Sequence, residues 1–219
     1  MRIIITGATG LVGAEAVRQA IEDNEIEEIV ALVRKPLDFQ HPKVKIIIHS
    51  NYLDYSGLET VFRNTDAMLW CLGISQSQVS KEEYIAITYD YSIAAAKALL
   101  AVNPEITFLF VSGMGASSDE KSMTLFGRIK GKTENELKRL PFKDLYIVRP
   151  GGIKPIHKNK NTAFSNKIMT PLFPLMKLIA PFSVITSVEL ALVMLDIVKN
   201  GTENQLSENV DLLKILKTL

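Results

Sequence analysis

Cysteine is nearly absent from the sequence, which has one in 219 residues, Cys71. A single thiol cannot form a disulfide within the chain, so a reduced, cytoplasmic setting is expected. The N-terminus lacks the signal-peptide order of positive charge, apolar stretch and small-residue cleavage site. Cys71 lies in the apolar run AMLWCLG and is expected to be a buried strand residue.

An excess of charge of either sign is also missing. The chain has 25 lysines and arginines against 24 acidic residues, which gives a formal net charge of +1. This balance argues against a nucleic-acid-binding surface, because such surfaces require clustered positive charge. The histidines at positions 41, 49 and 157 are dispersed and show no metal-ligand spacing, so no metal site is predicted.

Long uninterrupted apolar runs are the third absence. The most apolar stretch, residues 168–182, contains three prolines and a lysine, which argues against a membrane-spanning helix. Three roles stay open for residues 164–182: protein core, a substrate lid or an oligomer contact. The hydrophobic share of 47% still allows a sizeable core.

Short apolar runs alternate with amphipathic stretches over the first 150 residues. Buried strands are predicted at 2–6, 28–33, 44–48, 67–72, 106–112 and 145–149. Helices are predicted at 11–23, 55–63, 81–102 and 122–139. The segment RKPLDFQHP between the second and third strands is predicted to be a loop. The alternation predicts an α/β fold of the Rossmann type, a doubly wound and mostly parallel sheet with helices on both faces.

The pattern changes after Pro150. Residues 151–186 are predicted to be loops around a short helix near 163–179. No linker divides the chain. We therefore expect one domain over 1–219, in which 151–219 form a small C-terminal appendage that faces a substrate or a partner.

Two further helices are predicted near the C-terminus. The first covers 187–201, with Ser187 as its N-cap and Gly201 just past its end. Its apolar residues run nearly all round the helix, so it is expected to be buried. The second covers 210–219.

The stretch TGATGLVG, residues 6–13, follows the first predicted strand and opens the first helix. Its three glycines permit a tight turn, the approach of a pyrophosphate to the backbone, and close packing of the helix on the sheet. Backbone N–H groups at the helix N-terminus favour the phosphates. The sequence therefore predicts a nicotinamide dinucleotide as cofactor. The contact residues predicted in this turn are Gly7, Thr9, Gly10, Leu11, Val12 and Gly13.

The second predicted strand ends at Arg34 and Lys35, with no acidic residue before Asp38. An acid at this point takes the ribose 2′-hydroxyl of NAD, whereas an arginine accommodates the 2′-phosphate of NADP. The guanidinium of Arg34 is the better phosphate ligand, because it can bind in a bidentate manner. NADP(H) is therefore the favoured cofactor, with NAD(H) as the alternative.

Four stretches together resemble the short-chain dehydrogenase/reductase superfamily, and more closely its atypical branch. That branch includes the oxidoreductase-like Tat-interacting protein, bacterial NAD(P)H-binding relatives and regulators of the nitrogen-metabolite-repression type. The resemblance runs from Met1 to about Pro155. The stretches are TGATGLVG (6–13), CLG (71–73), FVSGMGA (110–116) with FGRIKGKTENEL (126–137), and IVRPGGI (147–153).

The resemblance implies further cofactor contacts. The family holds the adenine with an acidic segment after the third strand; here that segment reads SNYLD, with Asn51 in place of the first acid. The amide oxygen of Asn51 is still an acceptor for the adenine amino group. Cys71, Leu72 and Gly73, with the loop after them, would border the ribose and nicotinamide, and Pro150 would lie along the nicotinamide.

Catalytic members of the family use a Tyr-x-x-x-Lys pair and an upstream serine. By this resemblance Lys130 matches the lysine, which also contacts the nicotinamide ribose, and Ser112 matches the serine. Phe126 occupies the tyrosine position, and its ring cannot transfer a proton. Ser122, Thr124 or a water would have to supply the proton, and a threonine hydroxyl is a far weaker acid than a phenol.

Two functions follow from this reading. The first is a weak or unusual NADP(H)-dependent oxidoreductase, or an epimerase-like enzyme, acting on a small carbonyl or enone substrate. The alternative is a non-catalytic dinucleotide-binding regulator or redox sensor that acts through a protein partner. Either protein is expected to be a monomer or a homodimer.

Overall fold

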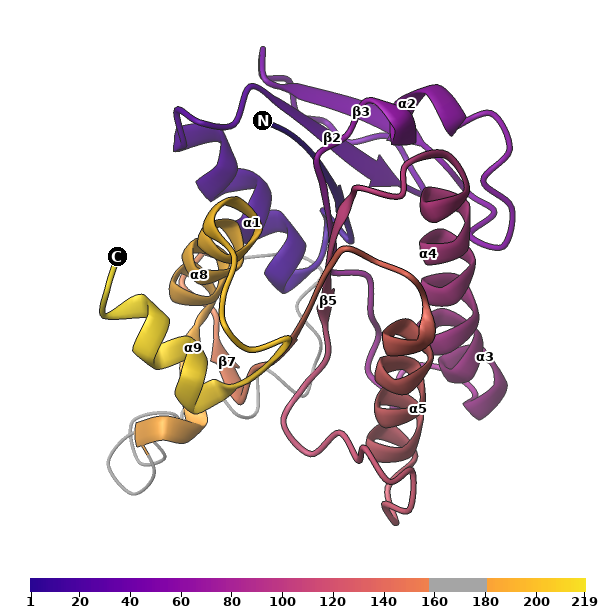
Figure 1. The fold of residues 1–219 in the computed structure, drawn as a ribbon, viewed down its shortest axis with the longest axis vertical. Helices are drawn as coiled ribbons and strands as arrows, with labels where there is room; N and C mark the ends of the chain where they lie inside the picture. Colours follow the sequence, from indigo (N-terminus) through magenta and orange to yellow (C-terminus); the bar gives the residue numbers. More distant parts are fainter. Residues whose placement is uncertain (158–180) are drawn as a thin grey trace.

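A parallel β-sheet forms the centre of the computed structural model (Figure 1). The structure describes residues 1–157 and 181–219. Within these ranges the main sheet has seven strands in the order β3-β2-β1-β4-β5-β6-β9, and all neighbours are parallel. They are β1 (Arg2–Thr6), β2 (Glu28–Val33), β3 (Val44–Ile48), β4 (Ala67–Trp70), β5 (Thr107–Val111), β6 (Asp144–Arg149) and β9 (Leu206–Glu208). The strand order reverses between β1 and β4, so a ligand crevice is expected there. The predicted Rossmann-type fold is confirmed.

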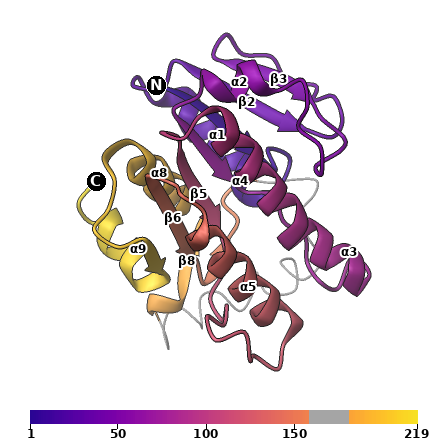
Figure 2. The same ribbon diagram turned by 45° about the vertical axis from the view of Figure 1, so that its right-hand side comes forward.

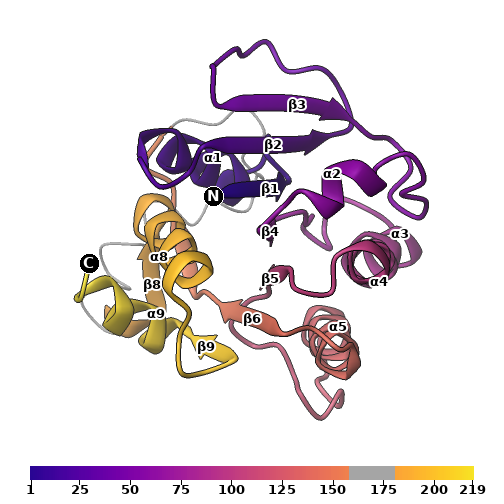
Figure 3. The ribbon, with the colours of Figure 1, turned by 45° about the horizontal axis from the view of Figure 1, so that its top comes forward.

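Helices cover both faces of the sheet, as Figures 2 and 3 show from two directions. Helices α1 and α8 pack together on one face with α9 beside them, and α2, α4 and α5 cover the other. The helices on the first face are α1 (Leu11–Glu22), α8 (Ser187–Asn200) and α9 (Asn209–Leu216). Those on the second are α2 (Glu59–Arg63), α3 (Lys81–Ile85), α4 (Tyr91–Val102) and α5 (Leu125–Arg139).

The central strands are apolar on both faces because both faces are buried. In β1, Ile3 and Ile5 contribute to the core under α1 and α8, whereas Ile4 contributes to the opposite core. All three side chains are fully buried. This is why the strands read as continuous apolar runs rather than as alternating patterns.

The connection between β2 and β3 contains no helix, as predicted for RKPLDFQHP. The two strands are nevertheless parallel, with Ile29 opposite Val44 and Val33 opposite Ile48. The connecting loop therefore returns along the length of the sheet without covering its face as a crossover helix would.

Helix boundaries differ from the prediction where side chains or turns intervene. Gly57 has φ 86° in the turn before α2, so this helix begins at Glu59 rather than at 55. Thr124 caps α5 by accepting a hydrogen bond from the Gly127 N–H, so α5 begins at 125 rather than at 122.

The predicted helix at 81–102 is one continuous helical segment with a π-helical turn, Ala86–Asp90, between α3 and α4. Among the described helices it is the one whose length and composition would allow it to cross a membrane. Its residues Ile93, Ala96 and Leu99 are part of the core against the sheet, and core helices of this kind meet the same criteria.

The C-terminal region differs most from the prediction. Three short strands were not predicted: β9 joins the main sheet, and β7 (Gly152–Lys154) pairs with β8 (Val184–Thr186) in a second small sheet of the described region. Thr186, rather than Ser187, caps α8 through a capping box with Glu189. Gly201 ends this helix with φ 75°, as expected. The helix predicted near 163–179 lies outside the described residues.

Candidate functional site

The glycine turn between β1 and α1 leaves no room for side chains. Gly7 has φ 65°, and a Cβ atom on it would lie 2.6 Å from the carbonyl oxygen of Cys71. A Cβ atom on Gly13 would overlap the Gly7 carbonyl. The turn therefore packs tightly against the end of β4, and α1 packs tightly against the turn, as a dinucleotide-binding turn requires.

Thr6 fixes this turn to the neighbouring strand end. Its buried hydroxyl oxygen accepts hydrogen bonds from the N–H groups of Cys71 and Leu72, both at 3.1 Å. Helix α1 then begins after Gly10, which provides no side-chain cap. Uncapped N–H groups and the helix dipole at this point favour an anion. The sequence analysis missed Thr6, because a threonine at a strand end carries no distinctive pattern.

A cleft of about 530 Å³ opens above the turn. The predicted cofactor residues that line it are Gly7, Thr9, Gly10, Arg34, Lys35, Cys71, Leu72 and Gly73. They come from the ends of β1, β2 and β4, on both sides of the point where the strand order reverses. The residues therefore fit a dinucleotide: a glycine cradle for the phosphates with basic side chains at the end of β2.

The remaining predicted contacts lie outside the described lining of this cleft. Asn51 is exposed, and its side-chain oxygen already accepts from the Leu53 N–H. Its neighbour Tyr52 lines the cleft instead, with its hydroxyl donating to the Leu32 carbonyl. Burial raises the pKa of Tyr52 to about 12, and the charge of Arg34 acts against this rise. The adenine contact of Asn51 stays a prediction.

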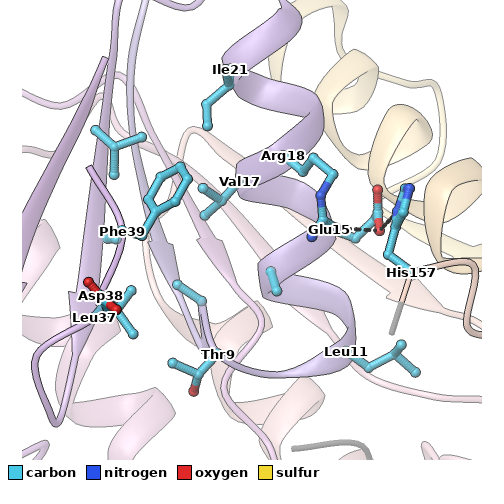
Figure 4. A pocket seen from close by; sticks show the side chains of 14 residues that line it. Thr9, Leu11, Glu15, Val17, Arg18, Ile21, Leu37, Asp38, Phe39 and His157 are labelled. Carbon is cyan, nitrogen blue, oxygen red and sulfur yellow. Dashed lines mark hydrogen bonds and ion pairs between the residues drawn. The ribbon is translucent and has the colours of Figure 1, made fainter. Parts of the chain in front are cut away.

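A second cavity of about 380 Å³ lies beside α1 (Figure 4). It borders the loop between β2 and β3 and includes Leu11, which was predicted to bind the cofactor. Glu15 is almost fully buried at its edge and bonds to His157 at 2.8 Å and to Arg18 at 3.0 Å. Burial raises the pKa of Glu15. Hydrogen bonds and charges from His157, Gln19 and Arg18 lower it by more, so the net shift is downward. The Glu15–His157 contact fixes the chain after β7 to the cofactor-side helix.

One face of α5 meets three consecutive residues at the end of β5. Residues four apart on a helix lie on the same face. Phe126 packs on Gly113, where an added Cβ would lie 2.8 Å from the ring Cζ. Lys130 donates to the Val111 carbonyl at 2.8 Å. One turn further on, Glu134 accepts from the Ser112 hydroxyl.

Lys130 is held in a largely apolar environment. It is 8% exposed, and its ammonium lies 4.6 Å from the centre of the Phe110 ring. Burial lowers the pKa of Lys130 to about 8, while the charge of Glu134 opposes this shift. Burial likewise raises the pKa of the Cys71 thiol to about 12, opposed by Lys130. The Lys130 ammonium and the Cys71 thiol therefore affect each other's pKa. Cys71 lines the cofactor cleft, whereas Lys130 does not.

Ser112 faces away from the predicted reaction site. Its hydroxyl bonds to Glu134, which also forms an ion pair with Arg149, and all three side chains are buried. Gly113, not Ser112, is the residue against the Phe126 ring. The structure thus does not bring Ser112 and Phe126 together, because successive residues of an extended chain point to opposite sides. Its carbonyl-orienting role stays untested, with the hydroxyl already bonded elsewhere.

Two glycines of α5 bring the preceding loop onto the helix. A Cβ on Gly127 would lie 2.5 Å from the Ser122 Oγ, and one on Gly131 would overlap the Ser117 carbonyl. Pro150, buried after β6, accepts at 2.8 Å from the Met114 N–H at the start of the same loop. The loop over the predicted reaction site is therefore fixed at both ends. Among the described residues, no group of three or more His, Cys, Asp or Glu side chains could hold a metal.

Curated relatives match most of the chain. The leucinostatins biosynthesis cluster protein T of Purpureocillium lilacinum is 34% identical over 161 residues, which cover 70% of this chain and 58% of that protein. The protein FMP52, mitochondrial, of Debaryomyces hansenii is 30% identical over 172 residues, covering 77% of this chain and 73% of that protein. The chain thus spans little more than half the length of the first relative.

The FMP52 relatives correct one prediction. Those of Debaryomyces hansenii and Eremothecium gossypii are named as mitochondrial proteins, which contradicts the cytoplasmic location expected here. The inference was wrong because a low cysteine content indicates a reducing environment and does not distinguish between compartments that provide one.

Solved structures share the fold at low sequence identity. A short-chain dehydrogenase family protein from Francisella tularensis has a TM-score of 0.67 at 13% identity, covering 94% of this chain and 96% of that one. The Bordetella bronchiseptica enzyme WbmF, solved with NAD+, has a TM-score of 0.70 at 12% identity, covering 99% and 77%. At these identities the likeness shows the fold.

A family model described as NAD(P)H-binding matches residues 7–173, which include the glycine turn, the end of β2 and the Phe126–Lys130 face of α5. The match and the relatives also agree with the resemblance to atypical short-chain dehydrogenases. The chain belongs to the NAD(P)H-binding family.

Proposed function

We propose that the protein binds NADP(H) beside the glycine turn and transfers hydride to quinone or enone acceptors rather than to simple aldehydes and ketones. One observation carries the proposal: Phe126, at the tyrosine position, packs on Gly113. Neither a phenylalanine nor a glycine has a hydroxyl, so this contact contains no proton donor. Lys130 remains on the same face of α5 and is the residue expected to contact the nicotinamide ribose. Bound nicotinamide supplies the hydride.

The choice of acceptor follows from the charge that hydride transfer creates. A simple ketone that accepts hydride becomes an alkoxide, which needs a proton from a positioned acid. A quinone that accepts hydride becomes a phenolate, and a phenol has a pKa of about 10, as for tyrosine. Such an anion persists until solvent protonates it. A site without an acid therefore reduces quinones with little loss but reduces ketones poorly.

Preference for NADP(H) rests on the end of β2. Arg34 and Lys35 are both exposed and both line the cleft, and no acidic side chain is among the described residues that line it. Two positive charges favour a 2′-phosphate and offer no acceptor to a 2′-hydroxyl. This supports NADP(H) over NAD(H).

The test compares NADPH oxidation by the wild type with a benzoquinone and with a benzaldehyde under the same conditions. We expect turnover with the quinone and, with the aldehyde, a rate at least about 100-fold lower. Deuterium at the transferred C4 position of NADPH should slow turnover of the quinone through a primary isotope effect, because hydride transfer breaks that C–D bond. A Gly10→Glu variant, which places a carboxylate in the phosphate cradle, is the control and should lose both reactions. Equal rates on the two acceptors would contradict the proposal, because the proton would then come from the protein.

The regulator alternative has its own signature in the same experiment. If NADPH binds and no acceptor is reduced, the absence of hydroxyls at Phe126 and Gly113 is better explained by a dinucleotide-binding regulator. The oxidoreductase proposal would then be abandoned.

A further inference from the structure

We propose that Glu134 is a positioning residue, which keeps Lys130 charged and correctly placed for the cofactor. This inference rests on the proposed contact between Lys130 and the dinucleotide. It assigns a role to a buried carboxylate that touches neither the glycine turn nor the described lining of the cofactor cleft.

The position of Glu134 follows from the helix. It lies four residues after Lys130, so both side chains project from one face of α5 toward the end of β5. Lys130 bonds to Val111 and Glu134 bonds to Ser112, the next residue of the chain. These two bonds, to the last residue of β5 and to the residue after it, fix both the rotation of α5 and its height above the sheet. Lys130 is positioned by this fixed helix.

The carboxylate of Glu134 is fully engaged by donors. Arg149 binds both of its oxygens, through Nε at 2.9 Å and through Nη2, and Ser112 donates to one of them. The other bonds of Arg149 go to Glu208 at 2.8 Å and to the Ser118 hydroxyl at 2.8 Å. A fully paired carboxylate can be buried where an unpaired one cannot.

The titratable and charged groups around Lys130 come from α5 itself and from three neighbouring strands. Glu134 of α5 and the Cys71 thiol at the end of β4 act on it directly, and Arg149 of β6 and Glu208 of β9 lie beyond Glu134. Burial alone favours the neutral amine, because a desolvated ammonium is costly. The charge of Glu134 opposes this lowering of the pKa, and the pKa of Lys130 is about 8 as a result of the two effects. Near neutral pH the lysine is therefore still charged, whereas without Glu134 it would lose its proton at a lower pH.

The experiment measures NADPH affinity by fluorescence from pH 6.5 to 9.5 in the full-length protein. In the wild type we expect affinity to fall as pH rises through about 8, where Lys130 loses its charge. Glu134→Gln should move that midpoint down by about one unit, since a nearby opposite charge typically shifts a pKa by one to three units. Glu208→Gln is the matched control, because it removes a more exposed carboxylate from the same arginine, and its midpoint should match that of the wild type.

Two further variants separate the possible failures. Lys130→Met should abolish the pH dependence; a dependence that persists would show that Lys130 does not contact the cofactor, and the proposed function would lose that contact. If Glu134→Gln does not fold, Glu134→Gln with Arg149→Gln removes the buried pair together and leaves only the partly exposed Glu208 carboxylate without its arginine. Arg149 does not act directly on Lys130, so the downward shift should remain. Equal midpoints in the wild type and in the Glu134 variant would overturn the inference.

Discussion

The two halves of the sheet differ in which features of a dinucleotide-binding fold they contain. In the half built from β1, β2 and β4, steric constraints are intact: Gly7 and Gly13 are closed against backbone, and Thr6 joins two strand ends. In the half built from β5, α5 and β6, the supporting side chains are intact, but Phe126 and Gly113 provide no hydroxyl. Under the proposed function, this difference means that cofactor binding and proton transfer are separable on this fold. The second half would keep its framework without an acid at position 126.

Restoring the acid should give the largest effect. We expect Phe126→Tyr to raise NADPH-dependent aldehyde reduction by about 10²–10⁴-fold, the usual contribution of a positioned general acid. The tyrosine differs by one hydroxyl, and Lys130 is one helical turn away to lower its pKa. Steady-state rates on the aldehyde decide, with Phe126→Leu as the control that adds no hydroxyl. An unchanged rate with NADPH binding intact would show that the second half has lost more than its acid.

Breaking the first half should destabilise the protein itself. Gly13→Ala places a methyl group in overlap with the Gly7 carbonyl, and backbone cannot move aside without opening the turn. We expect a loss of about 3 kcal/mol in the free energy of unfolding, at the upper end for overpacking, together with weaker NADPH binding. Urea unfolding measures it. Gly73→Ala is the control, since nothing lies within 4 Å of its added methyl; equal losses in both variants would contradict the steric account.

Within the first half, substitutions at the end of β2 should have a smaller effect, and that effect should be on NADPH affinity. Arg34→Ala should weaken NADPH binding by roughly ten- to a hundredfold, because a charge-assisted hydrogen bond is worth on the order of 1.5–3 kcal/mol. NADH affinity should hardly change, since it has no 2′-phosphate. Lys35→Ala is the comparison and should have a smaller effect than Arg34→Ala. A wild type that prefers NADH would show that this loop has been misinterpreted.

What the sequence could predict follows from the range of each interaction. The glycine turn, the apolar strands and the helixless β2–β3 loop are local patterns, and the fold predicted from them is confirmed. The strands β7, β8 and β9 have three residues each, too few to show any periodicity, so they exist through pairing that a sequence pattern does not reveal.

At the site, the sequence does not predict the direction in which each side chain points. The stretch VSGM places Ser112 and Gly113 next to one another, and only the geometry of the strand end decides which of them faces Phe126. Burial of Lys130 and Glu134 was equally hidden. Glu134 lies in KTENELK (132–138), which is typical of the polar outer face of a helix. Their partners, Val111 and Arg149, are 19 and 15 residues away in the chain.

The place of β9 in the sheet has a consequence for the order in which the two halves can be completed during synthesis. Every strand end around the glycine turn belongs to the first 73 residues. The core under α1 nevertheless includes α8, so this half also waits for residues 187–200. The second half waits for β9 and the start of α9: Glu208 completes the partners of Arg149, and Asn209 accepts from the Gly151 N–H. Since chains emerge N-terminus first, neither half is complete before this C-terminal region has been made. A nascent chain of this protein therefore completes its binding half and the half that would use the bound cofactor close together in time.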